Sequence, residues 1–303
     1  MTTRNQHHGD FRGKVRRCLL LGLATFLGSI IFGAGLSAEL VREWTPIFKG
    51  VAQYELSLTE PRPLEIRVIR VALYEPTIDF LVTPSNGSEP RDTGARLTSE
   101  FLEEFGCQVA INGSAFEPFA RQRGEPQSVL GLSLSRGDLY SDPSTADYDA
   151  LLISRDRRAR IEQPPINVQN AYNGLSGFKA LIMDGHIVVN DDSPPEGTSS
   201  QQHPRSAVGI TEDNRYLILM TIDGRHPGYS EGTTLLETAQ WMARFNAFNA
   251  LNLDGGGSTT LVIEGADGKA HIVNRPVRDR ERLVANHLGV FAKRLPLSDA
   301  AYD

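Results

Sequence analysis

The sequence predicts an α+β fold (mixed α/β): a single domain in which a mostly antiparallel twisted sheet is covered by a few helices, after an N-terminal signal or anchor segment. Three observations lead to this prediction. A hydrophobic content of 40% in 303 residues is enough for a packed core. The 28 glycines and 17 prolines, with many Val, Ile and Thr runs, indicate turns and strands. Two segments have helical periodicity, and no repeat or change of composition marks a second domain.

The N-terminus has the pattern of an export segment, because four basic residues at 12–17 precede an uncharged apolar run at 18–36. We expect residues 1–38 to be a signal peptide or membrane anchor, and residues 39–303 to be the domain, with its core at about 50–295. Gly35, Ser37 and Ala38 suit cleavage, while the run is also long enough to span a bilayer. In either case the domain lies outside the cytoplasm: periplasmic, secreted or anchored. Only an uncleaved segment would keep contact with the membrane.

Charge and cysteine content restrict the partners. Residues 1–38 contain five basic residues and one acidic residue, so their removal changes the net charge from −6 to −10. This charge disfavours a nucleic-acid partner. Cys18 lies in the apolar run, so Cys107 has no disulfide partner within the domain and is expected to be a small buried hydrophobic residue.

The sequence predicts strands and one short helix in the first half of the domain. The alternating stretch Leu64–Leu73 and the run Ile78–Val82 are predicted to be strands that form a hairpin. Thr98–Phe105 has apolar residues at helical spacing and ends at Gly106, which suits a helix C-terminus. The strand Val109–Ile111 then leads into a polar turn.

The second half has more strands and a longer helix. We expect a meander of strands at 130–134, 150–154 and 180–183, with turn signals at 137–138 and 184–185. The polar segment 191–203 reads as a mobile loop that can cover a site. Adjacent strands follow at 207–210 and 216–222, then a helix at 233–245 whose apolar face should cover the sheet, and strands at 250–253 and 261–263.

The most distinctive motif is Asp254-Gly255-Gly256-Gly257-Ser258-Thr259, which follows a predicted strand. Glycines let a ligand approach the backbone, and successive N–H groups with two hydroxyls can bind an anion. The alternative is a tight turn capped by Asp254. No Lys and no helix follow the glycines, so this is not a nucleotide-binding phosphate loop.

Three further polar segments lie at predicted strand ends. In the first, Arg205 can hold phosphate with its planar fork, and His203 can donate to the same anion or move a proton; alternatively Arg205 is a surface charge. The other two contain Asn112-Gly113-Ser114 and Asp223-Gly224-Arg225, and either can be only a turn. If all four segments meet at one edge of the sheet, they form a pocket.

In this order the segments resemble the phosphodiester glycosidase family. The resemblance covers about Val109 to Phe291, and its motifs are listed here in chain order: Ile111-Asn112-Gly113-Ser114-Ala115-Phe116, Pro204-Arg205-Ser206-Ala207-Val208-Gly209, Ile222-Asp223-Gly224-Arg225, Ser230-Glu231-Gly232, Asn252-Leu253-Asp254-Gly255-Gly256-Gly257-Ser258-Thr259 and Asn286-His287-Leu288-Gly289-Val290. It implies hydrolysis of a glycosyl phosphodiester that releases free sugar from a phosphorylated glycan or envelope polymer.

The chemistry of such a substrate suggests roles for the motif residues. The leaving group is already an acidic phosphate ester, so cations that hold phosphate can replace much of a general acid. A carboxylate must still stabilise positive charge at the anomeric carbon or activate water, and Asp254 and Asp223 are the candidates, with Glu117 and Glu231 in reserve. Phosphate binding is assigned to Arg205, assisted by Ser258, Thr259 and the glycine N–H groups. Asn112 and Arg225 would orient sugar hydroxyls or phosphate.

Other readings stay open. The histidines are scattered singles and no metal cluster is apparent, so we expect no cofactor, although Asp223 and Asp254 could hold a divalent cation with the phosphate. A non-catalytic glycan-binding or exopolysaccharide assembly protein of the cell envelope could use the same pocket without turnover. A phosphodiesterase that breaks the other P–O bond would leave a sugar phosphate.

Overall fold

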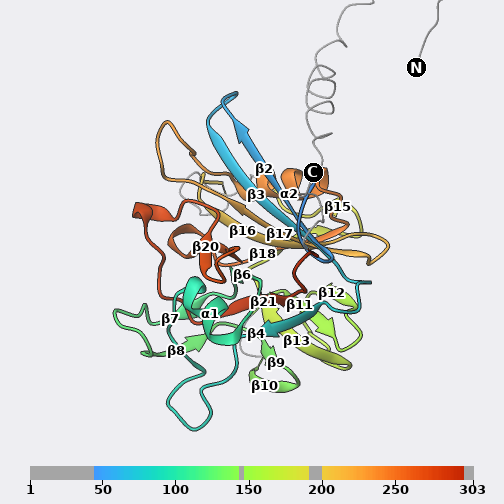
Figure 1. The fold of residues 1–303 in the computed structure, drawn as a ribbon, viewed down its shortest axis with the longest axis vertical. Helices are drawn as coiled ribbons and strands as arrows, with labels where there is room; N and C mark the ends of the chain where they lie inside the picture. The colour runs from blue at the N-terminus through green and yellow to red at the C-terminus, as the bar shows by residue number, and fades with distance from the viewer. Residues whose placement is uncertain (1–43, 143–146, 191–199, 297–303) are drawn as a thin grey trace, which may run out of the picture. The chain divides into compact units, whose positions relative to one another are not determined.

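The architecture is seen in a computed structural model that describes residues 44–142, 147–190 and 200–296. The export segment predicted for residues 1–38 and most of the polar loop predicted for 191–203 lie outside the described residues. Within the described ranges, no helix combines the length and the apolar character needed to cross a membrane. The described strands form four sheets, and their pairings are antiparallel (Figure 1).

The largest sheet contains eight strands that are distant in sequence. In spatial order they are β1 (Thr45–Phe48), β2 (Val51–Leu58), β3 (Leu64–Ala72), β17 (Tyr216–Ile222), β16 (Arg205–Ile210), β18 (Asn249–Asn252), β14 (Ala180–Met183) and β15 (His186–Ile187). Its central strands β17 and β16 are joined by a turn at Asn214, whose φ of 53° is left-handed. This sheet carries three of the four polar segments, those at Arg205, Asp223 and Asp254.

Three smaller sheets complete the described fold. One five-stranded sheet has the order β10 (Asp138–Ser141), β9 (Ser133–Ser135), β13 (Ala171–Ser176), β11 (Ala150–Ser154) and β12 (Ala159–Glu162). The other has the order β20 (Ala270–Ile272), β19 (Leu261–Glu264), β6 (Val109–Asn112), β21 (His287–Phe291) and β4 (Asp79–Val82). The smallest sheet contains β5 (Thr93–Gly94), β8 (Pro126–Val129) and β7 (Phe116–Glu117).

Two α-helices cover outer faces of these sheets. Helix α1 (Thr98–Phe105) packs on β6, β19, β20 and β21, and it ends at Gly106 with a φ of 69°. Helix α2 (Leu235–Arg244) packs on β14, β16 and β18, and begins with a capping box in which the Thr234 hydroxyl accepts from the Glu237 N–H. Figure 1 shows α1 beside β21 and α2 behind β3.

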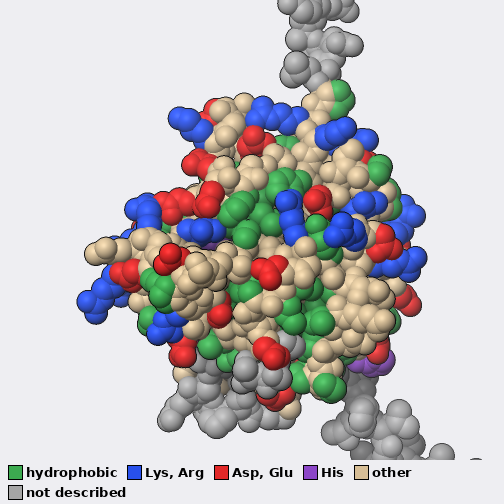
Figure 2. Space-filling model, turned by 90° about the horizontal axis from the view of Figure 1, so that it is seen from below, with side chains coloured by type: hydrophobic (Ala, Val, Ile, Leu, Met, Phe, Trp, Pro, Cys, Tyr) green, Lys and Arg blue, Asp and Glu red, His purple; other side chains and the backbone are tan. Residues whose placement is uncertain are grey.

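Charged side chains of both signs share the surface. Many form ion pairs, such as Arg67 with Glu65 at 2.9 Å and Arg294 with Glu264 at 2.7 Å. On the face shown in Figure 2, Lys and Arg side chains are interspersed with Asp and Glu over much of the surface. This mixture differs from the basic surface that a nucleic-acid-binding protein presents.

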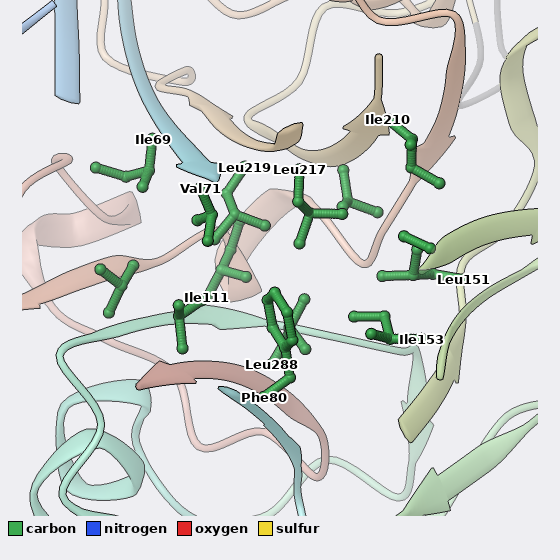
Figure 3. Close-up of a cluster of buried hydrophobic side chains, with 14 of the residues drawn as sticks. Ile69, Val71, Phe80, Ile111, Leu151, Ile153, Ile210, Leu217, Leu219 and Leu288 are labelled. Atoms are coloured by element: carbon green, nitrogen blue, oxygen red, sulfur yellow. The ribbon is translucent and has the colours of Figure 1, made fainter. Parts of the chain in front are cut away.

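The main hydrophobic core lies between the eight-stranded sheet and the two five-stranded sheets. Figure 3 shows Val71 and Leu219 from the large sheet facing Ile111 and Leu288 from one smaller sheet, with Leu151 from the other. Successive strand residues point to opposite faces, so Val109 and Ile111 enter this core while Ala110 contacts α1. Replacing a fully buried residue such as Ile111 by Ala would cost about 2–5 kcal/mol.

The residue predicted to be a small buried hydrophobe, Cys107, is confirmed as one. Its side chain is 1% exposed and packs with Phe101, Leu102 and Ala110 under α1. Burial raises the pKa of the Cys107 thiol to about 12. This thiol is therefore protonated and unsuited to nucleophilic chemistry at neutral pH.

The predicted α+β class is wrong. The protein is mostly β, with 42% strand and 10% helix, and its strands form several antiparallel sheets rather than one sheet covered by helices. The physical reason is that within the described residues only α1 and α2 keep a helical period long enough to cover a sheet. The other surfaces of the core are closed by further strands.

The predicted early hairpin is also wrong. Both strands exist as β3 and β4, but β3 pairs with β2 and β17, whereas β4 pairs with β21 in a different sheet. The meander is incorrect in the same way, because β14 belongs to the eight-stranded sheet while β9 and β11 lie in a five-stranded one. The adjacent pair β16 and β17, both helices, and the strands β11, β14, β18 and β19 are confirmed to within two residues.

Candidate functional site

A cavity of about 550 Å³ lies where the start of β16 meets the end of β18. These strands are antiparallel neighbours with Ala207 opposite Asn252, so continuing the register brings Arg205 and Asp254 to the same edge of the sheet. Seven of the predicted residues line the cavity: His203, Arg205, Arg225, Asp254, Gly255, Gly256 and Gly257. The segments around residues 205 and 254 therefore meet, as their positions at strand ends suggested.

The glycine loop is fastened to its surroundings by backbone hydrogen bonds. Asp254 N–H donates to the Gly113 carbonyl at 3.0 Å, and Gly256 N–H donates to the Pro204 carbonyl at 2.9 Å. At the 3₁₀ turn η3 (Gly256–Ser258), the Ser258 N–H donates to the Gly255 carbonyl and the Thr259 N–H donates to the Gly256 carbonyl. Several of the N–H groups expected to bind an anion are thus already used inside the protein.

Two glycines make room for arginine side chains over the loop. A Cβ on Gly257 would overlap the Arg282 guanidinium. Gly256 has a φ of 60°, and a Cβ there would lie 3.3 Å from the Arg225 guanidinium nitrogens. The glycines are therefore required by the close approach of two cations as well as by the turn.

Asp254 is half-buried, and its position in the cavity makes its carboxyl group a weaker acid than an exposed one. Burial raises the pKa of Asp254 to about 6, and the Ser258 hydroxyl, the Arg282 charge and the Gly255 N–H limit the rise. Such a carboxyl is mostly ionised at pH 7 but takes up a proton readily. A group of this kind can stabilise positive charge or accept a proton from water.

Arg225 and Arg282 face the cavity without a carboxylate partner. In the described part of the chain, no Asp or Glu oxygen lies within 4.0 Å of either guanidinium. Partial loss of water and the neighbouring Arg282 lower the pKa of Arg225. Arg282 donates weakly to Ser258 Oγ at 3.4 Å and stacks over the Phe119 ring at 5.0 Å. Two adjacent cations without a counter-ion suit an anionic ligand.

His203 and Arg205 border the same cavity. The Arg225 Nη2 lies 3.2 Å from His203 Nδ1 and can only donate to it, so His203 carries its proton on Nε2. Burial and the charges of Arg225 and Arg205 lower the pKa of His203, which leaves the ring neutral at pH 7. Arg205 donates to the carbonyls of Thr233 at 2.9 Å and Gln201 at 3.0 Å, and burial lowers its pKa to about 10.

Asn112, expected to orient substrate, lies buried beneath the cavity. Its Nδ2 donates to the Asp254 carbonyl at 2.5 Å, and its Oδ1 accepts from Ser206 Oγ at 2.7 Å and Thr260 N–H at 3.1 Å. The next residue, Gly113, is where a Cβ would overlap the Asn286 amide. These contacts make Asn112 and Gly113 supports of the loop that carries Asp254.

Asp223 lies outside the described lining of the cavity. It is 1% exposed, and its carboxylate accepts hydrogen bonds from Asn274 Nδ2 at 2.9 Å and from Arg275 N–H at 2.9 Å. Burial raises the pKa of Asp223, while these donors oppose the rise. The reserve carboxylates Glu117 and Glu231 are exposed and are also outside the described lining. Asp254 is thus the one predicted carboxylate that reaches the cavity.

Ser258 and Thr259 are buried against the loop. Ser258 contacts two residues of the lining: its hydroxyl accepts from Arg282 and forms a hydrogen bond with the Asp254 carboxyl. Thr259 is 1% exposed, and in the described structure its hydroxyl has no hydrogen-bond partner.

Sequence reasoning gave no role to three polar residues of the lining, Arg282, Asn252 and Lys179. Arg282 lies in the charged run 278–282, which looks like any solvated segment. Asn252 is the last residue of β18 and lies two residues before Asp254, so its place at a strand end was an available signal. The Asn252 side chain is 3% exposed, and within the described residues its Oδ1 has no hydrogen-bond partner. Lys179, Phe178 and Leu235 complete the lining.

Metal ligands do not gather in the described part of the chain. No three His, Cys, Asp or Glu side chains come together there in a way that could hold an ion. The expectation about cofactors and cations stays a prediction.

Comparison with known proteins gives relatives from animals and bacteria. N-acetylglucosamine-1-phosphodiester alpha-N-acetylglucosaminidase of Bos taurus is 29% identical over 208 residues, which are 63% of this chain and 38% of that protein. The protein of the same name from Homo sapiens is 30% identical over 205 residues, 63% of this chain and 39% of that protein. A prophage-derived uncharacterized protein, YomE of Bacillus subtilis, is 30% identical over 166 residues, 52% of this chain and 24% of that protein. The chain spans about two fifths of the length of the two animal relatives.

Solved structures share the fold. The zebrafish N-acetylglucosamine-1-phosphodiester alpha-N-acetylglucosaminidase catalytic domain, auto-inhibited by its pro-peptide, superposes with a TM-score of 0.62 at 20% identity, over 82% of this chain and 85% of that one. A putative exported protein of Burkholderia pseudomallei has a TM-score of 0.55 at 15% identity, over 76% and 74%. A profile of the family described as phosphodiester glycosidase matches residues 105–291. Because residues 105–291 are more than half of this chain, the chain belongs to the phosphodiester glycosidase family.

Proposed function

We propose that this chain hydrolyses a glycosyl phosphodiester and releases the free sugar from a phosphorylated glycan or envelope polymer. One observation carries the proposal: a single cavity is lined both by Asp254, whose carboxyl has a pKa of about 6, and by Arg225 and Arg282, which have no carboxylate within 4.0 Å in the described structure. The names of the animal relatives point to the same reaction class.

The proposed reaction breaks the bond between the anomeric carbon and the phosphate oxygen. The phosphate leaves with the electron pair of that bond as a monoester, held by Arg225, Arg282 and Arg205. The oxygen of water forms the new bond to the anomeric carbon. Asp254 either stabilises the positive charge that develops there or takes the proton from water and passes it to solvent.

Two other lining residues suit recognition of the sugar and phosphate. The Nε2–H of neutral His203 can donate to a phosphate oxygen or a sugar hydroxyl. The buried Oδ1 of Asn252 can accept from a sugar hydroxyl or amide, which would satisfy an acceptor that lacks a partner in the described structure.

Product analysis in ¹⁸O-labelled water tests the proposal. We expect free reducing sugar with the label on its anomeric oxygen, and an unlabelled phosphate monoester. Label in the phosphate with release of sugar phosphate would establish a phosphodiesterase instead. Binding of a panel of glycosyl phosphodiesters without any product would establish the non-catalytic glycan-binding reading.

We also propose that the domain acts outside the cytoplasm. The proposal rests on the basic and apolar pattern of residues 12–38 and on the fold shared with a putative exported protein. A reporter fused after Asp303 should be active only outside the cytoplasm; activity confined to the cytoplasm would refute it. Detection of mature protein starting near residue 39 would distinguish a cleaved signal from an anchor.

A further inference from the structure

A second cavity of about 560 Å³ adjoins the candidate active site. The two cavities share Arg225, Gly257 and Arg282 in their linings. Arg121, Arg278 and Arg280 line the second cavity and are not among the described residues that line the first. The pair Arg225 and Arg282 therefore stands at the boundary between a cavity with Asp254 and a cavity rich in arginine.

The second cavity has an excess of positive charge. In the described part of the chain, none of its five guanidinium groups has an Asp or Glu oxygen within 4.0 Å, although the whole chain has a net charge of −6. Its one acidic lining residue, Glu281, is held by Ser99, whose N–H and hydroxyl both donate to that carboxylate. By contrast, Arg275 just before this segment pairs with Asp279 at 2.6 Å. Arg282 is half-buried and the other four arginines are exposed, so solvent screens part of their mutual repulsion, and the positive potential that remains favours an anion.

The backbone of this segment is held in an uncommon conformation. Arg278 and Asp279 have φ values of 63° and 54°, in the left-handed region that non-glycine residues seldom adopt. The Arg275–Asp279 pair spans this turn, so the turn that carries Arg278 and Arg280 has a defined shape. Backbone conformations of this kind are often found where side chains are positioned for a ligand.

The number of arginines exceeds what one phosphodiester needs. A phosphodiester carries a single negative charge, which Arg225 and Arg282 at the boundary can balance. Three further guanidinium groups suit a group with its own negative charge, and their planar forks match phosphate oxygens. We propose that the second cavity binds a second phosphate on the leaving-group side of the substrate, so that the preferred substrate is a sugar attached to a leaving group with at least one further phosphate. This rests on the proposed function.

The test compares two synthetic substrates with the same sugar 1-phosphate. In the first the leaving alcohol is methanol, and in the second it is glycerol carrying a phosphate monoester. Because the second phosphate adds charge-assisted hydrogen bonds to the arginines of the second cavity, we expect the wild-type kcat/KM to be at least about tenfold higher for the second substrate. In the double variant Arg278→Gln/Arg280→Gln, the loss on the second substrate should exceed the loss on the first by at least about fivefold.

A matched control uses arginines in another cavity. The double variant Arg155→Gln/Arg158→Gln removes the same charge from a separate cavity and should keep the wild-type preference. Equal rates of the wild type on both substrates, or equal losses on both in the Arg278 and Arg280 variant, would overturn the proposal. Thermal unfolding of each variant shows whether it folds. If Arg278→Gln/Arg280→Gln does not fold, the single variant Arg280→Gln replaces it, and its losses of kcat/KM on the two substrates are compared in the same way.

A binding measurement separates this proposal from the proposed function. Affinities of the two substrates for Asp254→Asn, measured by calorimetry, require no turnover. Tighter binding of the second substrate, lost in the triple variant with Arg278→Gln and Arg280→Gln, supports the second phosphate site even if no hydrolysis is seen. Equal affinities would overturn it even if hydrolysis is established. Inorganic phosphate should bind more than about tenfold more weakly than the second substrate; equal affinity would assign the cavity to free phosphate.

Discussion

The candidate site and the cavity at residues 154–160 are both lined by arginine, and they differ in how the charge is balanced. The cavity of about 910 Å³ at residues 154–160 is larger than the candidate site, but its arginines contact carboxylate or aromatic side chains of the protein. Arg158 lies 3.5 Å from Asp156, Arg160 lies 2.7 Å from Glu162, and Arg155 stacks over Tyr172 at 4.0 Å. In the candidate site, neither the Arg225 nor the Arg282 guanidinium has a carboxylate oxygen within 4.0 Å among the described residues. Unbalanced charge beside a carboxylate, rather than volume, therefore distinguishes the candidate active site.

The largest expected effect comes from Asp254→Asn. This change keeps the shape but removes the charge, so kcat should fall by about a hundredfold or more while substrate affinity is largely kept. The measurement is steady-state kinetics on a glycosyl phosphodiester, with calorimetry for affinity. Asp156→Asn in the larger cavity is the control and should stay within about twofold of wild type. Wild-type turnover by folded Asp254→Asn would contradict the assignment.

Removal of a boundary cation should have the next largest effect. Arg282→Gln loses a charged hydrogen-bond donor to phosphate, worth about 1.5–3 kcal/mol, so kcat/KM should fall by about ten- to a hundredfold. Arg158→Gln should change kcat/KM by less than about twofold, because its charge is used in an ion pair. Similar losses in both variants would remove the distinction between the two regions.

The pH dependence of activity should report on Asp254. If the ionised carboxylate is required, kcat/KM should decrease about tenfold per pH unit below its pKa of about 6. Since the Arg282 charge lowers the pKa of Asp254, Arg282→Gln should move this acidic limb to higher pH. The pH–rate profiles of both proteins provide the measurement. If the acidic limb of the profile lies at the same pH in Arg282→Gln and in the wild type, a group other than Asp254 is responsible for the loss of activity at low pH.

Asp223→Asn should have the smallest effect on catalysis. The Asp223 carboxylate accepts from Asn274 and from the Arg275 N–H, so an amide in its place loses an acceptor and should reduce stability by about 1–3 kcal/mol. At a temperature where the variant is folded, kcat should remain within about threefold of wild type. A loss of kcat as large as that of Asp254→Asn would instead make Asp223 part of the reaction.

Local patterns predicted the elements better than their partners. Runs such as 150–154 and 180–183 are strands as expected, because short continuous apolar runs near turn signals are typical of buried strands. The partner of a strand is decided by distant residues: β3 pairs with β17, whose sequence lies more than a hundred residues away. This is why a hairpin and a single sheet were expected where the chain builds several sheets.

The same limit applies to the site. Arg205 and Asp254 were found because each lies at the end of a strand beside a glycine-containing or polar turn. The position of Asn112 depends on Ser206 and Thr260, which no local pattern connects to it. Arg282 reaches the cavity from a charged loop. Its guanidinium fits over the glycine loop because Gly257 has no side chain, and no pattern in the sequence links these two residues.

The attachment of the Asp254 loop has a consequence for local dynamics. The Asp254 N–H is bonded to Gly113, the Thr260 N–H to Asn112, and the Leu253 N–H to Ser206, so the loop is tied to two different sheets. These amides should exchange with deuterated solvent only when the sheets separate, at rates close to those of the core strands. Adaptation to different substrates would then come from rotation of the arginine side chains, and a crystal soaked with ligand should keep its backbone positions at this loop.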